Sequence, residues 1–212
     1  MALFPDREHA GQRLADALAR YAGDDRAVVL ALPRGGVVVG AQVARSLQLP
    51  LDVVVTRKIG APGDPEYAIA AVDADGAVLL GDEGAASSEY VRREAVAQQA
   101  EISRRLAAYR RGRPPLDVTG RTVVLVDDGV ATGLTLRAAI RYLRAHHAGR
   151  VVVAVPVAPP GTATRLRREA DEVVVLAEPE AFHAVGQFYS DFSQTSDAEV
   201  VALLGHGGGS PG

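Results

Sequence analysis

The sequence predicts an α/β fold in which a doubly wound, mostly parallel five-stranded sheet is flanked by helices and carries a small hood, or lid. Two observations predict the sheet. Its strands are short, continuous apolar runs, as strands buried on both faces are, and they alternate with segments of helical periodicity. A third observation predicts the hood, because a long insertion rich in Gly and Pro interrupts this alternation. We expect the hood to consist of an antiparallel hairpin and a C-terminal segment.

Five apolar runs are expected to form the strands of the sheet. They lie at residues 27–32, 51–57, 120–128, 150–157 and 171–177. Between them, apolar residues recur every three or four positions, which predicts helices. These helices are expected from Asp6 to about Tyr21, at 33–47, 88–111, 132–146 and 161–170, and after a cap at Ser196 or Asp197.

The insertion after the second strand has the pattern of a hairpin. Two apolar stretches within residues 58–81 are separated by Asp75 and Gly76, a pair typical of a tight turn. The expected organisation is one domain over 1–204, with hood elements at about 57–81 and 178–204 and a flexible, Gly-rich tail at 205–212.

The composition narrows the classes of function. The chain has 212 residues and a net charge of −3, so no overall basic field points to nucleic acid or to a membrane surface. Cysteine is absent, which removes disulfides, thiolate metal sites and cysteine nucleophiles. We expect a cytoplasmic protein, because the N-terminus lacks a signal-peptide pattern and no apolar run is long enough to span a bilayer.

The strand at 120–128 ends in two adjacent carboxylates. Ligands bind beyond the carboxyl ends of strands in doubly wound sheets, and this is where Asp127 and Asp128 lie. Ionised carboxylates only accept hydrogen bonds, so the vicinal hydroxyls of a sugar or the water shell of Mg²⁺ would suit them. The following residues, 129–135, can turn their backbone N–H groups toward a phosphate at a helix N-terminus. Diol and phosphate together indicate a ribose 5-phosphate.

Three alternative roles for the acidic pair fit the sequence less well. A response-regulator receiver would place the pair on the first strand and would not follow it with T-G-x-T. A Walker B strand would need a G-x-x-x-x-G-K-[ST] loop, which the chain lacks. A purely structural strand end would gain nothing from two repelling charges.

The whole segment VVLVDDGVATGLT resembles the signature of type I phosphoribosyltransferases, which bind phosphoribosyl pyrophosphate (PRPP). The chain matches that signature at Asp127, Asp128, Thr132, Gly133 and Thr135. The order of strands and helices also fits that family over most of the chain. The resemblance implies transfer of ribose 5-phosphate from PRPP to a nitrogenous base, with release of pyrophosphate, Mg²⁺ as cofactor and a role in nucleotide salvage.

The resemblance also assigns the residues that bind PRPP. They would be Asp127, Asp128, Gly129, Val130, Ala131, Thr132, Gly133, Leu134 and Thr135. Asp127 and Asp128 would hold Mg²⁺ mostly through water.

The segment LPRGG, at 32–36, resembles the family's pyrophosphate loop. Arg34 would face the pyrophosphate, and Gly35 and Gly36 would let backbone N–H groups approach it. The resemblance further implies a cis peptide bond between Pro33 and Arg34. A plain turn between strand and helix is the alternative.

The segment at 56–72 resembles the family's mobile loop. Arg57 and Lys58 would supply cations to the pyrophosphate site, and Lys58 and Arg34 would act in catalysis. Ala131 stands where hypoxanthine-guanine enzymes have an aspartate, as in the adenine and orotate enzymes, so any general acid or base must come from elsewhere. Glu66 is the candidate.

The segment FHAVGQFYSDF, at 182–192, loosely resembles the base-binding segment of the 6-oxopurine enzymes, with spacings that differ by a residue on each side. Phe182 would stack on a base, Val185 would lie beside it, and Asp191 would touch base or metal. The alternative is a core aromatic cluster of Phe182, Phe188, Tyr189 and Phe192.

Two classes of function remain open. One is an enzyme whose partners are PRPP, a nitrogenous base or nucleoside monophosphate, and a second copy in a homodimer. The other is a regulatory protein that senses PRPP or a nucleotide without turnover. Glutamates are interleaved with the arginines of the helix at 88–111, which favours a solvated surface over a nucleic-acid site.

Overall fold

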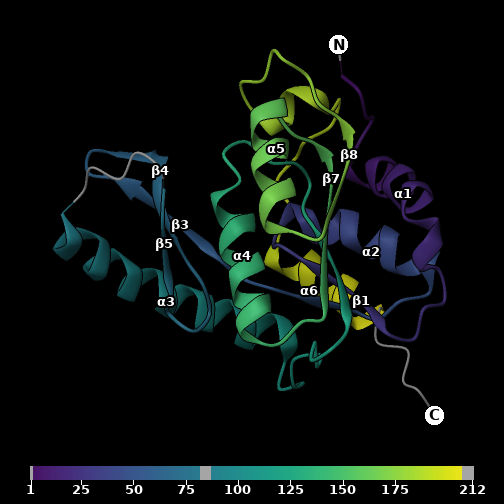
Figure 1. The fold of residues 1–212 in the computed structure, drawn as a ribbon, viewed down its shortest axis with the longest axis horizontal. Helices are drawn as coiled ribbons and strands as arrows, with labels where there is room; N and C mark the ends of the chain where they lie inside the picture. The colour runs from purple at the N-terminus through teal and green to yellow at the C-terminus, as the bar shows by residue number, and fades with distance from the viewer. Residues whose placement is uncertain (1, 82–86, 207–212) are drawn as a thin grey trace.

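The computed structural model describes residues 2–81 and 87–206. A five-stranded sheet in the order β2-β1-β6-β7-β8 forms its centre, and all neighbouring strands are parallel (Figure 1). Its strands are β1 (Ala27–Ala31), β2 (Leu51–Val53), β6 (Thr122–Val126), β7 (Arg150–Val157) and β8 (Glu172–Ala177). The predicted doubly wound α/β fold is therefore confirmed.

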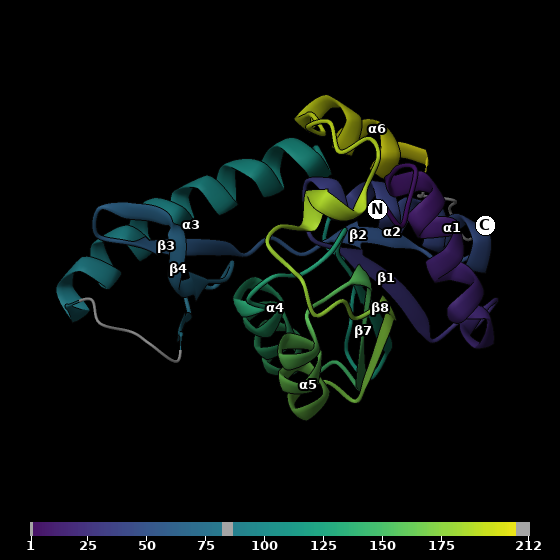
Figure 2. The same ribbon diagram turned by 90° about the horizontal axis from the view of Figure 1, so that it is seen from above.

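Helices cover both faces of this sheet. The described helices are α1 (Arg7–Ala17), α2 (Gly35–Leu47), α3 (Ser88–Arg110), α4 (Leu134–Ala145), α5 (Pro160–Glu169) and α6 (Asp197–His206), with 3-10 turns η1 (Ala19–Tyr21) and η2 (Val185–Phe188), and all but α3 lie against the central sheet. Successive strand residues enter different cores, because side chains alternate along a strand. Val29 and Val124 pack with α1, α2 and α6, whereas Val28 and Leu125 pack with α4 and α5. Figure 2 shows these two groups of helices on opposite sides of the sheet.

The hood is a separate antiparallel sheet. It contains β3 (Arg57–Ala61), β4 (Asp64–Val72) and β5 (Val78–Leu80) in that order, and it projects to one side together with α3 (Figures 1 and 2). Ala71 and Leu79 of this sheet pack on Leu134 and Ala138 of α4. Helix α4 therefore lies between the two sheets and links the hood to the turn after β6.

The prediction of a second strand over residues 51–57 is wrong at its C-terminal end. Strand β2 stops at Val53, and Arg57 begins β3 in the other sheet. Val54 and Val55 between them are apolar and buried, and Val54 still donates its N–H to Ala31 of β1. Continuous apolarity marks burial, so it cannot show where a chain passes from one sheet to another.

The hood has one strand more than the expected hairpin. Strands β4 and β5 turn at Asp75 and Gly76 as predicted, but β3 occupies residues expected to be loop. Its pairing with β4 shifts register on both sides of Gly60. A Cβ on Gly60 would lie 2.5 Å from Cα of Pro65, so Gly at this position permits an irregular strand where composition suggested none.

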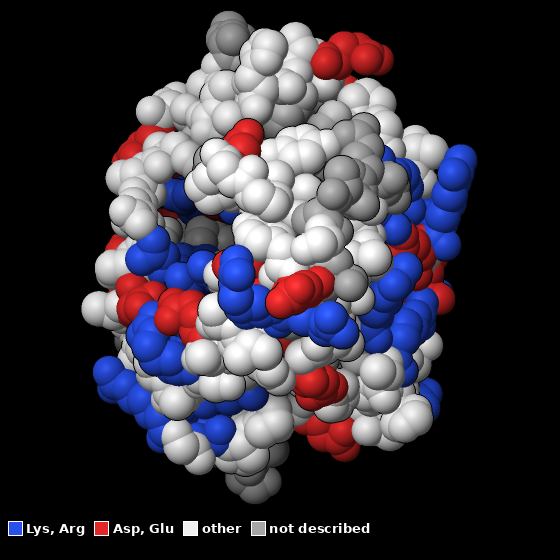
Figure 3. Space-filling model, turned by 90° about the vertical axis from the view of Figure 1, so that its left-hand side faces the viewer, with Lys and Arg blue, Asp and Glu red and all other residues white. Residues whose placement is uncertain are grey.

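The face that carries the hood is crossed by Lys and Arg side chains with Asp and Glu among them (Figure 3). On α3, Arg104 and Arg105 both donate to Glu101 at 2.7 Å. No helix within the described ranges is long and apolar enough to cross a membrane. Helix α6 continues to His206, and the rest of the expected tail, 207–212, falls outside the described residues.

Candidate active site

Two loops meet at the carboxyl ends of neighbouring strands β1 and β6. Asp127 and Asp128 follow β6, and residues 32–34 connect β1 to α2, which begins with Gly35 and Gly36. A Cβ on Gly35 would overlap Oδ2 of Asp128, and one on Gly36 would lie 2.9 Å from Oδ1 of Asp127. Only glycine therefore lets the start of α2 lie directly against both carboxylates.

The turn from Gly129 to Gly133 is held from outside. Gly129 and Gly133 have φ angles of 153° and 80°, which favour glycine. Thr162 of α5 donates its hydroxyl to the carbonyl of Ala131 at 2.6 Å, and Val130 donates its N–H to Val157 at 3.0 Å. Gly133 caps α4 without a side-chain hydrogen bond. The first N–H groups of α4 can therefore bind an anion.

Burial raises the pKa values of the two adjacent carboxyl groups. Burial, and then the charge of Asp128, raise the pKa of Asp127 well above its usual 3.8. Burial also raises the pKa of Asp128, and the hydrogen bond from Arg7 offsets part of that rise. A cation beside the pair therefore favours its ionised form.

Arg7 is a cation of the site that sequence reasoning missed. Its Nε donates to Oδ2 of Asp128 at 2.7 Å, and the two side chains are 12% and 15% exposed. Arg7 also donates from Nη1 to the carbonyl of Ser193 at 2.8 Å, and its guanidinium carbon lies 3.8 Å from the ring centroid of Phe192. No local pattern marks it, because Arg7 opens a helix capped by Asp6, where an arginine looks like a solvated surface residue.

The loop at residues 32–36 has the predicted cis bond. The peptide bond between Pro33 and Arg34 is cis, and Arg34 is the N-cap residue of α2. A hydrogen bond from Tyr109 lowers the pKa of Asp197, and the nearby charge of Arg34 lowers it further. Arg34 therefore lies near the contact between α3 and α6.

The sequence model of the family described as "Phosphoribosyl transferase domain" matches residues 4–193. The chain belongs to this family. Two Mycobacterium tuberculosis proteins, both named "Putative phosphoribosyl transferase", are 50% identical to it over 211 residues, which is 96% of this chain. The alignment covers 47% of each of these proteins, so the chain spans about half the length of the curated relatives it matches.

Solved structures resemble this phosphoribosyl transferase domain along most of its length. The protein TT1426 from Thermus thermophilus has a TM-score of 0.80 and 49% sequence identity, and the match covers 96% of this chain and 98% of that one. The protein AQ2163 from Aquifex aeolicus has a TM-score of 0.52 and 15% identity, covering 85% and 76% of the two chains. The second likeness is one of fold alone.

The two cations expected in the mobile loop of the phosphoribosyl transferase domain lie on different faces of the hood sheet. Arg57 donates from Nε to Gln98 of α3 at 2.8 Å, and burial, then Arg105, lower its pKa. Lys58 pairs with Ala71, which packs on α4, so Lys58 lies on the α4 side. Thr56 ties this segment to the motif, because its hydroxyl donates to the carbonyl of Thr135 at 3.1 Å.

Among the residues expected to bind a base, Phe182 and Val185 pack on one apolar cluster, whereas Asp191 is exposed. Val185 fills the space above Gly129, where a Cβ would lie 2.5 Å from its Cγ1. The ring centroids of Phe182 and Phe188 are 5.0 Å apart, so Phe182 belongs to an aromatic cluster. The carboxylate of Asp191 accepts the N–H of Ser193 at 2.9 Å and is exposed. The side chain of Glu66 lies outside the described residues.

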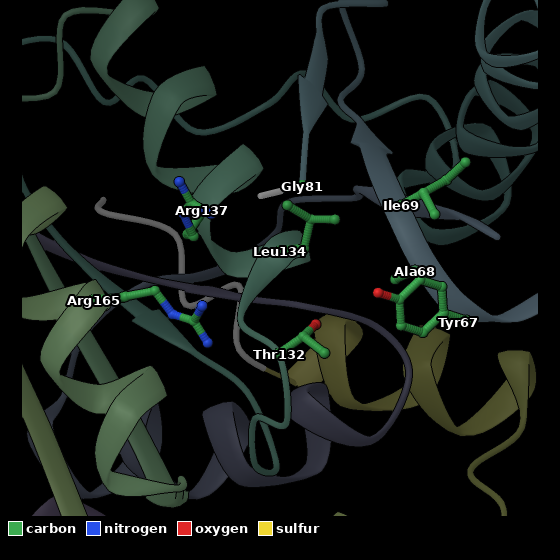
Figure 4. A pocket seen from close by; sticks show the side chains of 8 residues that line it. All are labelled: Tyr67, Ala68, Ile69, Gly81, Thr132, Leu134, Arg137 and Arg165. Atoms are coloured by element: carbon green, nitrogen blue, oxygen red, sulfur yellow. The ribbon is translucent and has the colours of Figure 1, made fainter. Parts of the chain in front are cut away.

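A cavity of about 220 Å³ lies beside the turn, between the hood, α4 and α5. It is lined by Tyr67, Ala68, Ile69, Gly81, Thr132, Leu134, Arg137 and Arg165. Tyr67 and Arg165 approach Thr132 from opposite sides (Figure 4). The cavity therefore lies at the Thr132 end of the turn, and neither Asp127 nor Asp128 lines it.

The carboxylate pair fits the Mg²⁺ that the family implies. Asp127 and Asp128 offer oxygen atoms alone, and no group of three or more His, Asp or Glu side chains within residues 2–81 and 87–206 could hold a metal. Mg²⁺ commonly keeps several waters and binds one or two carboxylates together with substrate phosphates. The donors present therefore suit a metal that arrives with its phosphate ligand.

Proposed function

We propose that the protein transfers ribose 5-phosphate from PRPP to a nitrogenous base and releases pyrophosphate. One observation carries the proposal, namely the packing of Gly35 and Gly36 against Asp128 and Asp127. It joins a loop suited to a pyrophosphate to carboxylates suited to a ribose diol. Membership of the phosphoribosyl transferase domain family supports the same chemistry.

Each part of the site would bind one part of PRPP. Asp127 and Asp128 would accept hydrogen bonds from the ribose hydroxyls, and residues 129–135 would bind the 5-phosphate through backbone N–H groups. When bound, Mg²⁺ would neutralise charge on the pyrophosphate. The two carboxylates and the turn would mainly orient the sugar.

Arg34 and Lys58 would act on the leaving group. Displacement at C1 of the ribose has a transition state like an oxocarbenium ion, and negative charge grows on the departing pyrophosphate. Arg34 lies in the loop beside the carboxylates, and Lys58 follows Thr56, which is tied to the motif. Their positive charges would stabilise the transition state more than bound PRPP. Glu66 is the proposed acid or base for the acceptor.

The acceptor base would approach from the C-terminal segment. Val185 lies against Gly129 and would form one wall of its pocket. Phe182 and Asp191 would line the pocket only if the segment rearranged, because one packs on Phe188 and the other closes a local turn. A homodimer and a role in nucleotide salvage belong to the same proposal and rest on the family resemblance.

A sensor of PRPP or of a nucleotide is the second candidate function. The packing of Phe182 into the aromatic cluster favours it, because a sensor needs no ordered base pocket. An enzyme would convert PRPP and release pyrophosphate, whereas a sensor would bind PRPP without converting it.

A screen of acceptors separates the two. Purines, pyrimidines and orotate would each be supplied with Mg²⁺-PRPP while pyrophosphate release is followed. Release that depends on one base, and that is lost in Asp128→Asn, supports the enzyme. PRPP binding without release for any base supports the sensor.

A further inference from the structure

Arg7 joins three parts of the site that are distant in sequence. It lies at the start of α1, contacts Asp128 after β6, and donates to Ser193 in the C-terminal segment. A Cβ on Gly35 would lie 2.6 Å from its Nε, so the side chain also crosses the pyrophosphate loop. The isolated bridge between Phe4 and Tyr189 fixes the N-terminus beside this segment (Figure 2).

Arg7 lies where the N-termini of two helices meet. Arg7 is the first residue of α1, and it lies beside Gly35, the first residue of α2. Both helix N-termini carry partial positive charge, so each disfavours a cation. Nearby negative charge must compensate for the positive charge of Arg7 at this position. Asp6 and Glu8 beside Arg7 supply some of it, and so does Asp128, but Mg²⁺ and a sugar diol would draw on the carboxylate of Asp128.

Not every donor of the Arg7 guanidinium has a partner among the described residues. Nε and Nη1 donate to Asp128 and Ser193, and no described residue accepts a hydrogen bond from Nη2. Phe192 covers one face of the guanidinium plane and restricts its movement. An arginine held in this way keeps its remaining donors in a fixed orientation, which suits phosphate oxygens.

We propose that Arg7 is a further binding residue of this site, which donates to the pyrophosphate of PRPP while it holds Asp128 in place. The proposal rests on the proposed function, because it assigns a contact to the same ligand. It places a cation from α1 across the pyrophosphate loop from Arg34. Arg7 thus recognises both the leaving group and the carboxylate that orients the sugar.

The test compares two ligands that differ by the pyrophosphate on C1. Calorimetry would measure the dissociation constants of Mg²⁺-PRPP and of ribose 5-phosphate for the wild type, Arg7→Gln and Arg7→Lys. Gln keeps a donor near Asp128 and loses the charge, whereas Lys keeps the charge and loses the planar fork. Arg13→Ala is the matched control, because Arg13 lies on the same helix, is exposed and contacts the ring of Phe4.

We expect Arg7→Gln to weaken Mg²⁺-PRPP binding about 10- to 100-fold, as the loss of one charged hydrogen-bonding partner does, and ribose 5-phosphate binding less than about 3-fold. The dissociation constant of Mg²⁺-PRPP for Arg7→Lys should lie between those of the wild type and Arg7→Gln. Arg13→Ala should bind both ligands as the wild type does. Thermal unfolding would verify that each variant is folded. If Arg7→Gln does not fold, the comparison of Arg7→Lys with the wild type replaces it.

Three results would overturn the proposal. Equal weakening of both ligands would mean that Arg7 acts through Asp128 alone. Unchanged or tighter PRPP binding would mean that Arg7 is structural or blocks the site. A folded wild type that binds neither ligand would reject the proposed function as well, whereas the first two results leave that function standing.

Discussion

Gly35 and Asp128 are in contact where the first turn of α2 meets the end of β6. A side chain at Gly35 would overlap Oδ2 of Asp128 and press on Nε of Arg7. Both atoms belong to side chains, whereas the corresponding position at Gly36 also approaches a backbone atom, Cα of Asp127, at 3.0 Å. The contact at Gly35 therefore shapes the site more than it supports the fold.

The substitution Gly35→Ala should separate binding from stability. Its methyl group would displace the carboxylate of Asp128, and displacements of about 1 Å can cost a site on the order of 100-fold. We expect PRPP affinity to fall about 10- to 100-fold, while the free energy of unfolding changes by less than about 1 kcal/mol.

Gly161→Ala is the control for this substitution. Gly161 lies in the first turn of α5, and no atom lies within 4 Å of a Cβ built there. It should leave PRPP affinity unchanged. Wild-type affinity in Gly35→Ala would show that the two loops do not act on one ligand.

The substitution Lys58→Ala should reduce turnover more than binding. A cation that acts on the departing pyrophosphate stabilises the transition state more than bound PRPP. We expect kcat to fall about 10- to 100-fold, on the scale of one charged hydrogen bond, with the dissociation constant of PRPP changed less than about 3-fold. Steady-state kinetics with the acceptor found by the screen would measure the first quantity and calorimetry the second.

Lys58→Arg keeps the charge at this position and serves as the control. It should recover part of the lost kcat. The role assigned to Lys58 is wrong if kcat in Lys58→Ala equals that of the wild type, or if PRPP binding falls as much as kcat.

The hydrogen bond from Tyr109 to Asp197 should make stability depend on alkaline pH. It joins α3 to α6 at 2.6 Å, and burial, then this bond, raise the pKa of Tyr109 to about 12. An unfolded tyrosine has a pKa of about 10. Because the folded pKa is the higher one, the contribution of Tyr109 is complete below about pH 10 and is lost as the pH rises toward 12.

Urea unfolding of the wild type and Tyr109→Phe would measure this dependence. At pH 8 the variant should be less stable by about 1.5 kcal/mol, because it lacks one hydrogen bond to a charged group. The difference should shrink between about pH 10 and about pH 11.5. A difference that stays constant over that interval would contradict the raised pKa.

The main sheet could be predicted because its strands are buried on both faces. The runs around Val28, Val124 and Val152 have no polar position, and nothing but a parallel α/β sheet uses such strands between helices. The carboxylates and the glycine turn could be located for the same reason, since they follow one of these runs directly.

Other features depend on contacts between distant segments. Strand β3 exists because Arg57 to Ala61 pair with β4, and Gly60 permits an irregular register there. Arg7 reaches Asp128 across 121 positions of sequence, and no local pattern encodes that contact. Phe182 could have faced a base or the core, and its packing on Phe188 depends on how the C-terminal segment folds back.

The central claim is that residues 127–135 bind PRPP, and calorimetry on Asp128→Asn tests it most directly. Asn keeps the shape of Asp128 and removes the charge that accepts from Arg7 and from the ribose diol. We predict that the dissociation constant of Mg²⁺-PRPP rises about 10- to 150-fold, as the loss of a charged hydrogen-bonding partner implies. A dissociation constant equal to that of the wild type, in a variant that unfolds at the wild-type temperature, would contradict the claim.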